Sequence, residues 1–300
     1  MKQILSILCL ILISAVCFAG IDENAGNYGY KFLNVPYGPV ALSLAGRGVY
    51  NTDNPGAFLL QPAVSCINDQ HLLGISHNLW LADTQANMLA YSYARKVDHF
   101  GVSLRNLDYG DLENRDDMGF LIGSYHPVDI DATANYARRL TPSFYLGANL
   151  GILYQKLDSA SSLALHTDLG FCYLPPLNDT KLAFAFRNFG VANKTEEERV
   201  KLPTCFELDV NKGFRLIDQH FYLNGSAIQT MDEDLKGSIG LQCDIFNTLS
   251  LRTGYLLGYD AQDFSAGFGV KYKNISVDYG YGDYNSELND VHSFGVTYRF

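Results

Sequence analysis

The last ten residues, 291–300, read VHSFGVTYRF. In a β-strand, successive side chains point to opposite faces of the sheet. One face of this stretch would carry Phe294, Val296, Tyr298 and Phe300. The other face would carry Ser293, Gly295, Thr297 and Arg299. A strand that is apolar and aromatic on one face and polar on the other fits a wall between lipid and water, so the stretch predicts a membrane-spanning strand.

The same period of two residues recurs from residue 69 onward and predicts fourteen antiparallel strands. They span residues 69–80, 87–97, 100–108, 129–140, 144–156, 163–174, 180–189, 204–214, 219–229, 236–245, 249–259, 264–273, 275–283 and 291–300. Short connections, such as 141–143 and 273–274, alternate with connections that are longer on average, such as 109–128 and 190–203. Outer-membrane β-barrels sort their periplasmic turns and extracellular loops in this way.

The even number of strands places both ends of the sheet at the periplasmic rim. We therefore expect the last strand to close the barrel by pairing with segment 69–80. Residues Met118 to Tyr125 could form a further strand, but an odd number would break this parity. We assign them to a long extracellular excursion.

Composition agrees with a membrane barrel. The chain holds 27 Gly, 20 Tyr and 18 Phe, yet after the first 19 residues it has no run of 18 apolar residues, which excludes a helical membrane span. A secreted all-β sandwich or propeller is the alternative, but it has no reason to sort its loops by length. The net charge of −10 and the lack of a basic stripe argue against nucleic acid as a partner.

Residues 1–19 predict a secretory signal peptide, with Lys2 before an apolar core at 4–13 and a cleavage site at Cys17-Phe18-Ala19. Four cysteines follow in the mature chain. The alternation places Cys172 and Cys243 on opposite faces of the wall, and side chains that point apart cannot be bridged. We expect buried or free thiols, no C-x-x-C metal site and no cofactor.

Residues 20–66 do not alternate and precede the barrel of residues 67–300. Pro39 is well placed to open a short helix that Gly46 and Gly48 would end. Fourteen strands enclose a lumen too wide for side chains alone to fill. The sequence therefore predicts that this apolar segment folds into the lumen as a plug, and the alternative is a disordered periplasmic tail.

The polar faces of the strands predict a network of paired charges in the lumen, because buried charges are kept paired. Its expected members are His166, Asp168, Arg187, Arg252, Lys271, Asp278 and Arg299. His166 and Asp168 share one strand face, but neither a partner serine nor a G-x-S-x-G motif accompanies them, so we expect no enzyme. The best candidate for a partner-binding surface is the loop 109–128, with Asp111, Glu113, Arg115, Asp116 and Asp117.

Several motifs resemble the PorV/PorQ family of outer-membrane barrels. The opening is the most specific, with Phe32-Leu33-Asn34-Val35-Pro36-Tyr37-Gly38, then Ala41-Leu42-Ser43-Leu44-Ala45-Gly46, Asp53-Asn54-Pro55 and Gln61-Pro62-Ala63. Further matches follow in order across nearly the whole mature chain, among them Asn135-Tyr136-Ala137-Arg138 and Leu251-Arg252-Thr253-Gly254-Tyr255. The sequence departs from the family pattern at Pro39-Val40, Ala45 and Gln61. In length it resembles PorQ more than PorV.

This resemblance implies a FadL-like, fourteen-stranded, non-enzymatic barrel in the outer membrane of a Gram-negative bacterium. It implies a role in type IX protein secretion or cell-surface attachment, in which extracellular loops bind secretion-system or surface-protein partners. The terminal aromatic residue resembles the C-terminal signal of such barrels, which implies that Tyr298 and Phe300 form an assembly signal. The alternatives are a FadL-like uptake channel for a hydrophobic ligand, gated by the plug, and a passive structural barrel.

Overall fold

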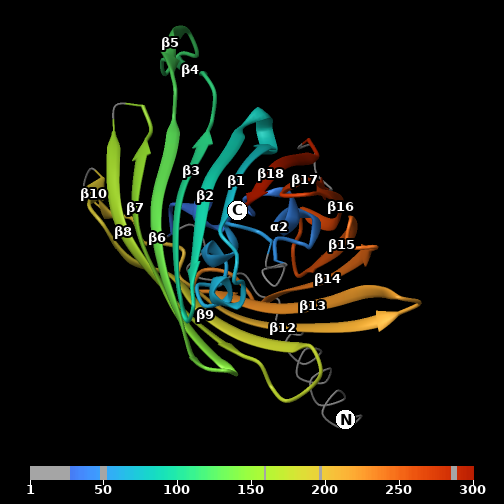
Figure 1. The fold of residues 1–300 in the computed structure, drawn as a ribbon. Coiled ribbons are helices and arrows are strands. Elements are labelled where there is room, and N and C mark those ends of the chain that lie inside the picture. The colour runs from blue at the N-terminus through green and yellow to red at the C-terminus, as the bar shows by residue number, and fades with distance from the viewer. Residues whose placement is uncertain (1–27, 48–52, 159, 196–197, 285–288) are drawn as a thin grey trace.

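The computed structural model describes residues 28–47, 53–158, 160–195, 198–284 and 289–300 (Figure 1). Within these residues, fourteen strands form one closed antiparallel barrel, which confirms the predicted fold. The strands are β1 Leu72–Leu79, β2 Gln85–Arg95, β3 Asp98–Asp108, β6 Val128–Thr141, β7 Phe144–Lys156, β8 Ser161–Tyr173, β9 Thr180–Ala192, β12 Cys205–Leu216, β13 Gln219–Thr230, β14 Lys236–Ile245, β15 Leu249–Leu257, β16 Gln262–Tyr272, β17 Ile275–Tyr284 and β18 Val291–Arg299. The predicted signal peptide lies outside the described residues.

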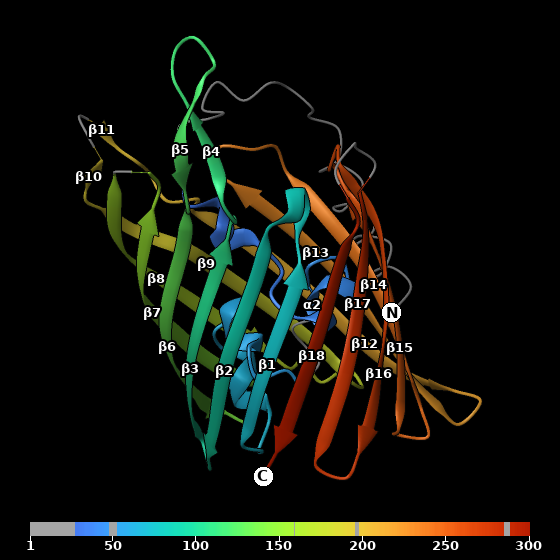
Figure 2. The same cartoon turned by 90° about the horizontal axis from the view of Figure 1, so that it is seen from above.

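The barrel closes where its last strand meets its first. β18 pairs antiparallel with β1, with Val296 opposite Ile75. On its other side β18 pairs with β17. Figure 2 shows β1 and β18 side by side at the front of the wall. The prediction that segment 291–300 closes on segment 69–80 is therefore confirmed.

The outer face of the wall is apolar. Along β18, Phe294, Val296 and Tyr298 are exposed by 41–49%, whereas Ser293 on the opposite face of the strand is fully buried. Other strands repeat the pattern, as in β15, where Leu251 is exposed and Arg252 is buried. A closed barrel leaves no unpaired strand edge in hydrocarbon, and an apolar outer face suits contact with lipid.

The described helices are all too short or too polar to cross a membrane.

The two rims differ as the sequence predicts. At one rim the connections are tight, such as the two residues between β16 and β17. At the other rim they are longer, and the longest carries a separate hairpin of β4 Leu112–Arg115 and β5 Leu121–Tyr125. Figure 1 shows this hairpin projecting beyond the barrel. A second small hairpin pairs β10 Lys194–Thr195 with β11 Glu198–Arg199. Residues Met118 to Tyr125 thus form no barrel strand, which confirms that assignment.

The described part of segment 20–66 lies against the inner face of the wall. It contains the short helices η1 Lys31–Asn34, α2 Pro39–Ser43, η2 Ala57–Leu59 and η3 Val64–Ile67, whereas η4 Leu81–Asp83 lies in the β1–β2 loop. Pro39 opens α2 as predicted, and Gly46 follows with a φ of +75°. Phe58 and Leu42 are fully buried. That this segment closes the lumen as a plug stays a prediction.

Inward-facing glycines seat the segment on the wall. A Cβ at Gly280 of β17 would lie 2.5 Å from the Pro39 carbonyl oxygen, and a Cβ at Gly295 of β18 would lie 2.8 Å from the Pro39 ring. A Cβ at Gly147 of β7 would lie 2.3 Å from the Pro62 carbonyl oxygen. These contacts leave no room for a side chain, so glycine lets the segment and the wall pack backbone to backbone.

The segment is anchored at both rims. At the rim with long loops, Lys31 pairs with Asp232 (2.5 Å) and Glu233 (2.7 Å) of the β13–β14 loop. At the rim with short turns, the Cys66 thiol donates to the Val97 carbonyl oxygen in the β2–β3 turn. The described residues 28–47 and 53–66 therefore contact the long-loop rim near their start and the short-turn rim near their end, before the chain enters β1.

Candidate functional site

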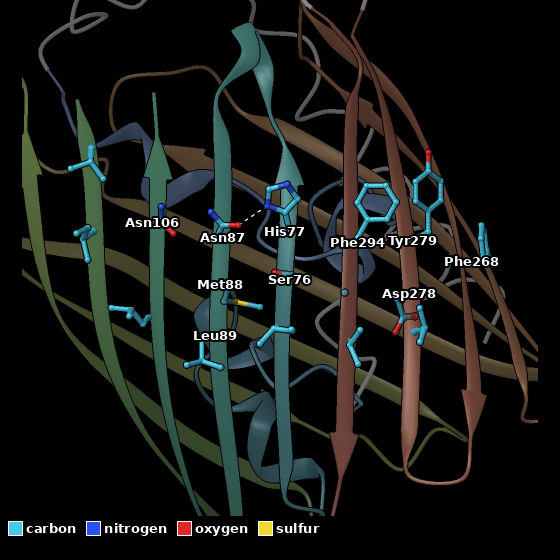
Figure 3. A pocket seen from close by; sticks show the side chains of 17 residues that line it. Ser76, His77, Asn87, Met88, Leu89, Asn106, Phe268, Asp278, Tyr279 and Phe294 are labelled. Atoms are coloured by element: carbon cyan, nitrogen blue, oxygen red, sulfur yellow. Dashed lines mark hydrogen bonds between the residues drawn. The ribbon is translucent and has the colours of Figure 1, made fainter. Parts of the chain in front are cut away.

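A groove of about 850 Å³ lies on the outer face of the wall, around the β1–β18 seam (Figure 3). One side is formed by outward side chains of β2, β3 and β6, including Leu89, Leu104 and Ile130. The other side is formed by β16, β17 and β18, including Phe268 and Val277. The groove falls within the usual size range of small-molecule sites and is mostly apolar.

Two adjacent rows of side chains form most of the groove. Strand pairing aligns Leu104, Leu89, Ile75, Val296 and Val277 in one continuous apolar row. The next row, closer to the long-loop rim, aligns Asn106, Asn87, His77, Phe294 and Tyr279. The part of the groove closer to the short-turn rim is therefore apolar. The part closer to the long-loop rim, called the upper row below, carries the polar side chains of His77, Asn87 and Asn106.

A smaller cavity lies on the inner side of the same wall. Its volume is about 20 Å³, roughly the space of one water molecule. Pro39 and Pro55 of the N-terminal segment line it. The groove and the cavity share the lining residues Ile75, Ser76, Met88, Asp278 and Gly295. At the seam, the same wall residues therefore face the groove on one side and the cavity on the other.

The structure places the seven predicted lumen residues in four separate groups. Arg252 Nη1 lies 2.7 Å from Asp278 Oδ1, directly behind the groove, and Arg252 Nε donates to Gln242 Oε1. Lys271 and Arg299 both pair with Asp53 of the N-terminal segment, the latter at 3.1 Å. The role of these residues as a network that holds a plug stays a prediction.

The third group, around His166 and Asp168, is buried. His166 Nε2 is 2.7 Å from Asp131 Oδ1, and Arg105 donates to the other oxygen of Asp131 at 2.7 Å. Asp168 accepts from Asn149 Nδ2 at 2.8 Å and lies 3.8 Å from His166 Nδ1. His166 thus lies between the carboxylates of Asp131 and Asp168 in a buried polar cluster.

Arg187 belongs to the fourth group. Its Nη2 lies 2.9 Å from Glu207 Oε2, and Arg47 of the N-terminal segment approaches the other Glu207 oxygen at 3.2 Å. Arg187 and Glu207 are each only 1% exposed. Glu207 thus supplies one buried negative charge to both guanidinium groups.

The sequence prediction missed the partners Arg105, Asp131, Glu207 and Asp53. Arg105 stands opposite Asp131 in the β3–β6 register, so alternation plus register could have found that pair. The sequence prediction also missed the polar residues of the groove. Their signal was available, because His77, Asn87 and Asn106 fall on the apolar faces of their strands and break the alternation there.

The predicted partner-binding loop contains the β4–β5 hairpin. Arg115 Nη2 lies 2.5 Å from Glu113 Oε2, and Asp116 caps the turn by accepting from the Met118 and Phe120 amides. Asp111 accepts from His126 at 3.0 Å at the base of the hairpin, and this hydrogen bond raises the pKa of His126. Asp117 lies exposed in the hairpin turn. Partner binding by these residues stays a prediction.

The predicted assembly signal sits at the short-turn rim. Tyr298 and Phe300 are exposed by 41% and 63%, and their rings meet edge to face at 4.9 Å. The Phe300 amide donates to the His71 carbonyl oxygen, which extends the pairing of the seam to the last residue. The four cysteines among the described residues are free thiols, as predicted.

No protein-family model matches the chain, and no curated protein sequence matches it. The comparison of structures does find similar folds. The Pseudomonas putida toluene transporter TodX has 12% identity and a TM-score of 0.63, over 88% of this chain and 97% of that chain. A Pseudomonas aeruginosa FadL homologue has 12% identity and a TM-score of 0.60, over 88% and 98%. The CymD monoaromatic hydrocarbon channel has 12% identity and a TM-score of 0.62, over 88% and 97%.

These likenesses establish the fold. The chain has the same fold as these barrels, and fourteen strands close it among the residues that the structure describes. Its apolar outer face, with aromatic residues near both rims, is that of an outer-membrane protein. The protein is thus a transmembrane barrel of the Gram-negative outer membrane.

Proposed function

We propose that this non-enzymatic barrel takes up hydrophobic small molecules across the outer membrane and that the N-terminal segment is its gate. The observation that carries the proposal is the shared lining of groove and inner cavity by Ile75, Ser76, Met88, Asp278 and Gly295. An apolar molecule in the groove has only this seam between itself and the lumen. The similarity to barrels described as a toluene transporter and a monoaromatic hydrocarbon channel supports the same substrate class.

Uptake requires the N-terminal segment to move. The inner cavity of about 20 Å³ holds no hydrophobic molecule while Pro39 and Pro55 stand behind the seam. Pro39 packs on Gly280 and Gly295, so a shift of α2 would open space directly behind the groove. The described ion pairs of Asp53 and Lys31 hold the segment at its two ends.

A disulfide lock tests the gate. A Cβ at Gly240 would lie 3.4 Å from the Leu44 Cβ, close to the separation that a disulfide needs. The variant Leu44→Cys/Gly240→Cys, in a background with the native cysteines of the mature chain replaced by alanine, should stop toluene uptake by vesicles when oxidised. Reduction should restore it.

The matched control is Gly237→Cys/Leu257→Cys. These residues pair across β14 and β15, and a Cβ at Gly237 would lie 3.7 Å from the Leu257 Cβ, away from the N-terminal segment. Oxidation of this control should leave uptake unchanged. Equal uptake by the locked and reduced forms of the first variant would contradict the gate, and no uptake by the reduced protein would contradict the channel.

A second candidate is a role of the PorV/PorQ type in protein secretion or surface attachment. The observation in its favour is the β4–β5 hairpin, which exposes Met118 by 83%, Phe120 by 67% and Ile122 by 62%. Exposed apolar residues on a projecting element suit contact with another protein. Deletion of residues 112–125 should then retain cargo in the periplasm or release a surface protein, and normal export in the deletion strain would exclude this role.

A further inference from the structure

The upper row of the groove contains three polar side chains that face outward in a lipid-facing wall. His77, Asn87 and Asn106 stand side by side on β1, β2 and β3. Each is half-buried. Polar groups within a membrane span are costly unless they are paired, and they mark functional sites by default. These three side chains therefore need hydrogen-bond partners when the barrel is in its membrane.

The three side chains satisfy one another only in part. His77 Nδ1 lies 2.6 Å from Asn87 Oδ1. Because the amide oxygen accepts, Nδ1 is the donor, and Nε2 of the neutral ring is left as an acceptor. The Asn87 amide group and the Asn106 side chain have no side-chain hydrogen bond within the described part of the chain. A ligand that fits therefore offers at least one acceptor and one donor.

The distance of this polar row from the long-loop rim indicates which end of a ligand it contacts. His77 lies two residues before the end of β1, on the order of 7 Å below the long-loop rim. Directly below it, the row from Leu104 through Ile75 to Val277 is apolar. Figure 3 shows Asn106, Asn87 and His77 in one line, with Leu89 below them. A polar end towards the cell exterior and an apolar body below it is the orientation of a lipid in the outer leaflet.

We infer that the groove binds one acyl lipid of the outer leaflet, with its chain along the apolar row and its hydroxyl, amide or carbonyl groups on His77, Asn87 and Asn106. The concave wall contacts such a chain from β3 on one side to β17 on the other, which a flat barrel wall does not do. The lipid would occupy the same groove as the hydrocarbon of the proposed uptake. The two proposals are nevertheless separable, because lipid binding is measured as retention of a probe and uptake as its passage into vesicles.

The test compares two probes, lipid A, which has acyl chains with amide and hydroxyl groups, and hexadecane, which has a chain alone. The purified barrel is loaded with each probe and washed, and the retained probe is extracted and quantified. His77→Leu/Asn87→Leu should lower lipid A retention about tenfold through the lost hydrogen bonds and leave hexadecane retention unchanged. Thr167→Val, an outward polar residue of β8 outside the groove, is the matched control and should change neither.

A steric variant provides the second arm. Val296→Trp fills the groove and should lower the retention of both probes, whereas Leu165→Trp on the outer face of β8 should lower neither. If the double polar variant does not fold, Asn106→Leu takes its place. Equal lipid A retention by wild type and polar variant would overturn the inference, as would equal retention by Val296→Trp and Leu165→Trp.

Discussion

Asp53 of the N-terminal segment lies 3.1 Å from Arg299, the penultimate residue of the chain, and it also pairs with Lys271 of β16. Only about a quarter of each of these side chains is exposed. Asp53, which follows the 48–52 stretch, thus links the N-terminal segment to β18, the strand that closes the barrel. The N-terminal segment and the end of the chain thus meet through one carboxylate.

Loss of this carboxylate should loosen the segment at the short-turn rim. Asp53→Asn leaves two cations without their charge partner, and partly exposed pairs of this kind contribute about 1 kcal/mol. We expect faster hydrogen exchange in residues 54–66 and unchanged exchange in β6 to β8. Asp98→Asn, which breaks the pair of Asp98 with Arg138 at the same rim, is the control and should not affect residues 54–66.

A methyl group at Gly280 should displace α2. The added Cβ would meet the Pro39 carbonyl oxygen at 2.5 Å, and overpacking of this kind costs about 1–3 kcal/mol. Gly280→Ala should therefore lower the urea midpoint of the folded barrel in micelles. Gly225→Ala on β13 is the matched control, because no atom lies within 4 Å of its added Cβ. Equal midpoints for the two variants would show that α2 can move without cost.

The buried pair of Arg187 and Glu207 should be the most sensitive ionic site. Glu207→Gln leaves the guanidinium groups of Arg187 and Arg47 without a counter-charge, and breaking such a buried pair costs about 3–5 kcal/mol. The same change at exposed Glu113, which pairs with Arg115, should cost less than about 1 kcal/mol. Urea titrations of both variants measure the difference. A loss at position 207 as small as that at position 113 would contradict the role of Glu207 as the buried ion-pair partner of both arginines.

The sequence predicts the barrel well because one physical rule covers the whole wall. Lipid on one side and a polar lumen on the other impose a period of two on every strand, as in Phe294 to Arg299. The seam follows from parity alone. The bounds of the strands shift by a few residues, since β2 starts at Gln85 and β16 at Gln262, where loop residues continue the ladder.

This rule of alternation does not predict which side chains contact one another inside the barrel. Alternation assigns Arg187 and Glu207 to the inner face, but it does not give the register that brings them together. Asp53 lies in a segment with no period at all, so nothing in the sequence pairs it with Arg299. The groove was missed for a different reason, because alternation tells inside from outside but not where the wall is concave.

The β4–β5 hairpin should respond to pH. Hydrogen bonding to Asp111 and the nearby charge of Asp108 raise the pKa of His126 above its usual value of about 6.5. Protonated His126 ties the two carboxylates together below that value, and the tie is lost as pH rises through the raised pKa. A spin label attached at Met118→Cys should therefore become more mobile when the pH is raised from acidic to mildly alkaline.

The control for this response is His126→Gln. With no titrating ring at the base of the hairpin, the mobility of the label should stay constant across the same pH range. A label that responds to pH equally in both proteins would assign the effect to another group.

The contacts of residues 28–47 and 53–66 with the inner face of the wall bear on the order of assembly. These residues precede β1 in the chain, yet they contact loops at one rim and turns at the other. A wall that sealed first would have to admit the whole segment through its mouth and past inward side chains such as Arg187. We therefore expect the seam of β1 and β18 to close last, around a segment that is already in place, so that closure of the wall and burial of the segment occur in one step.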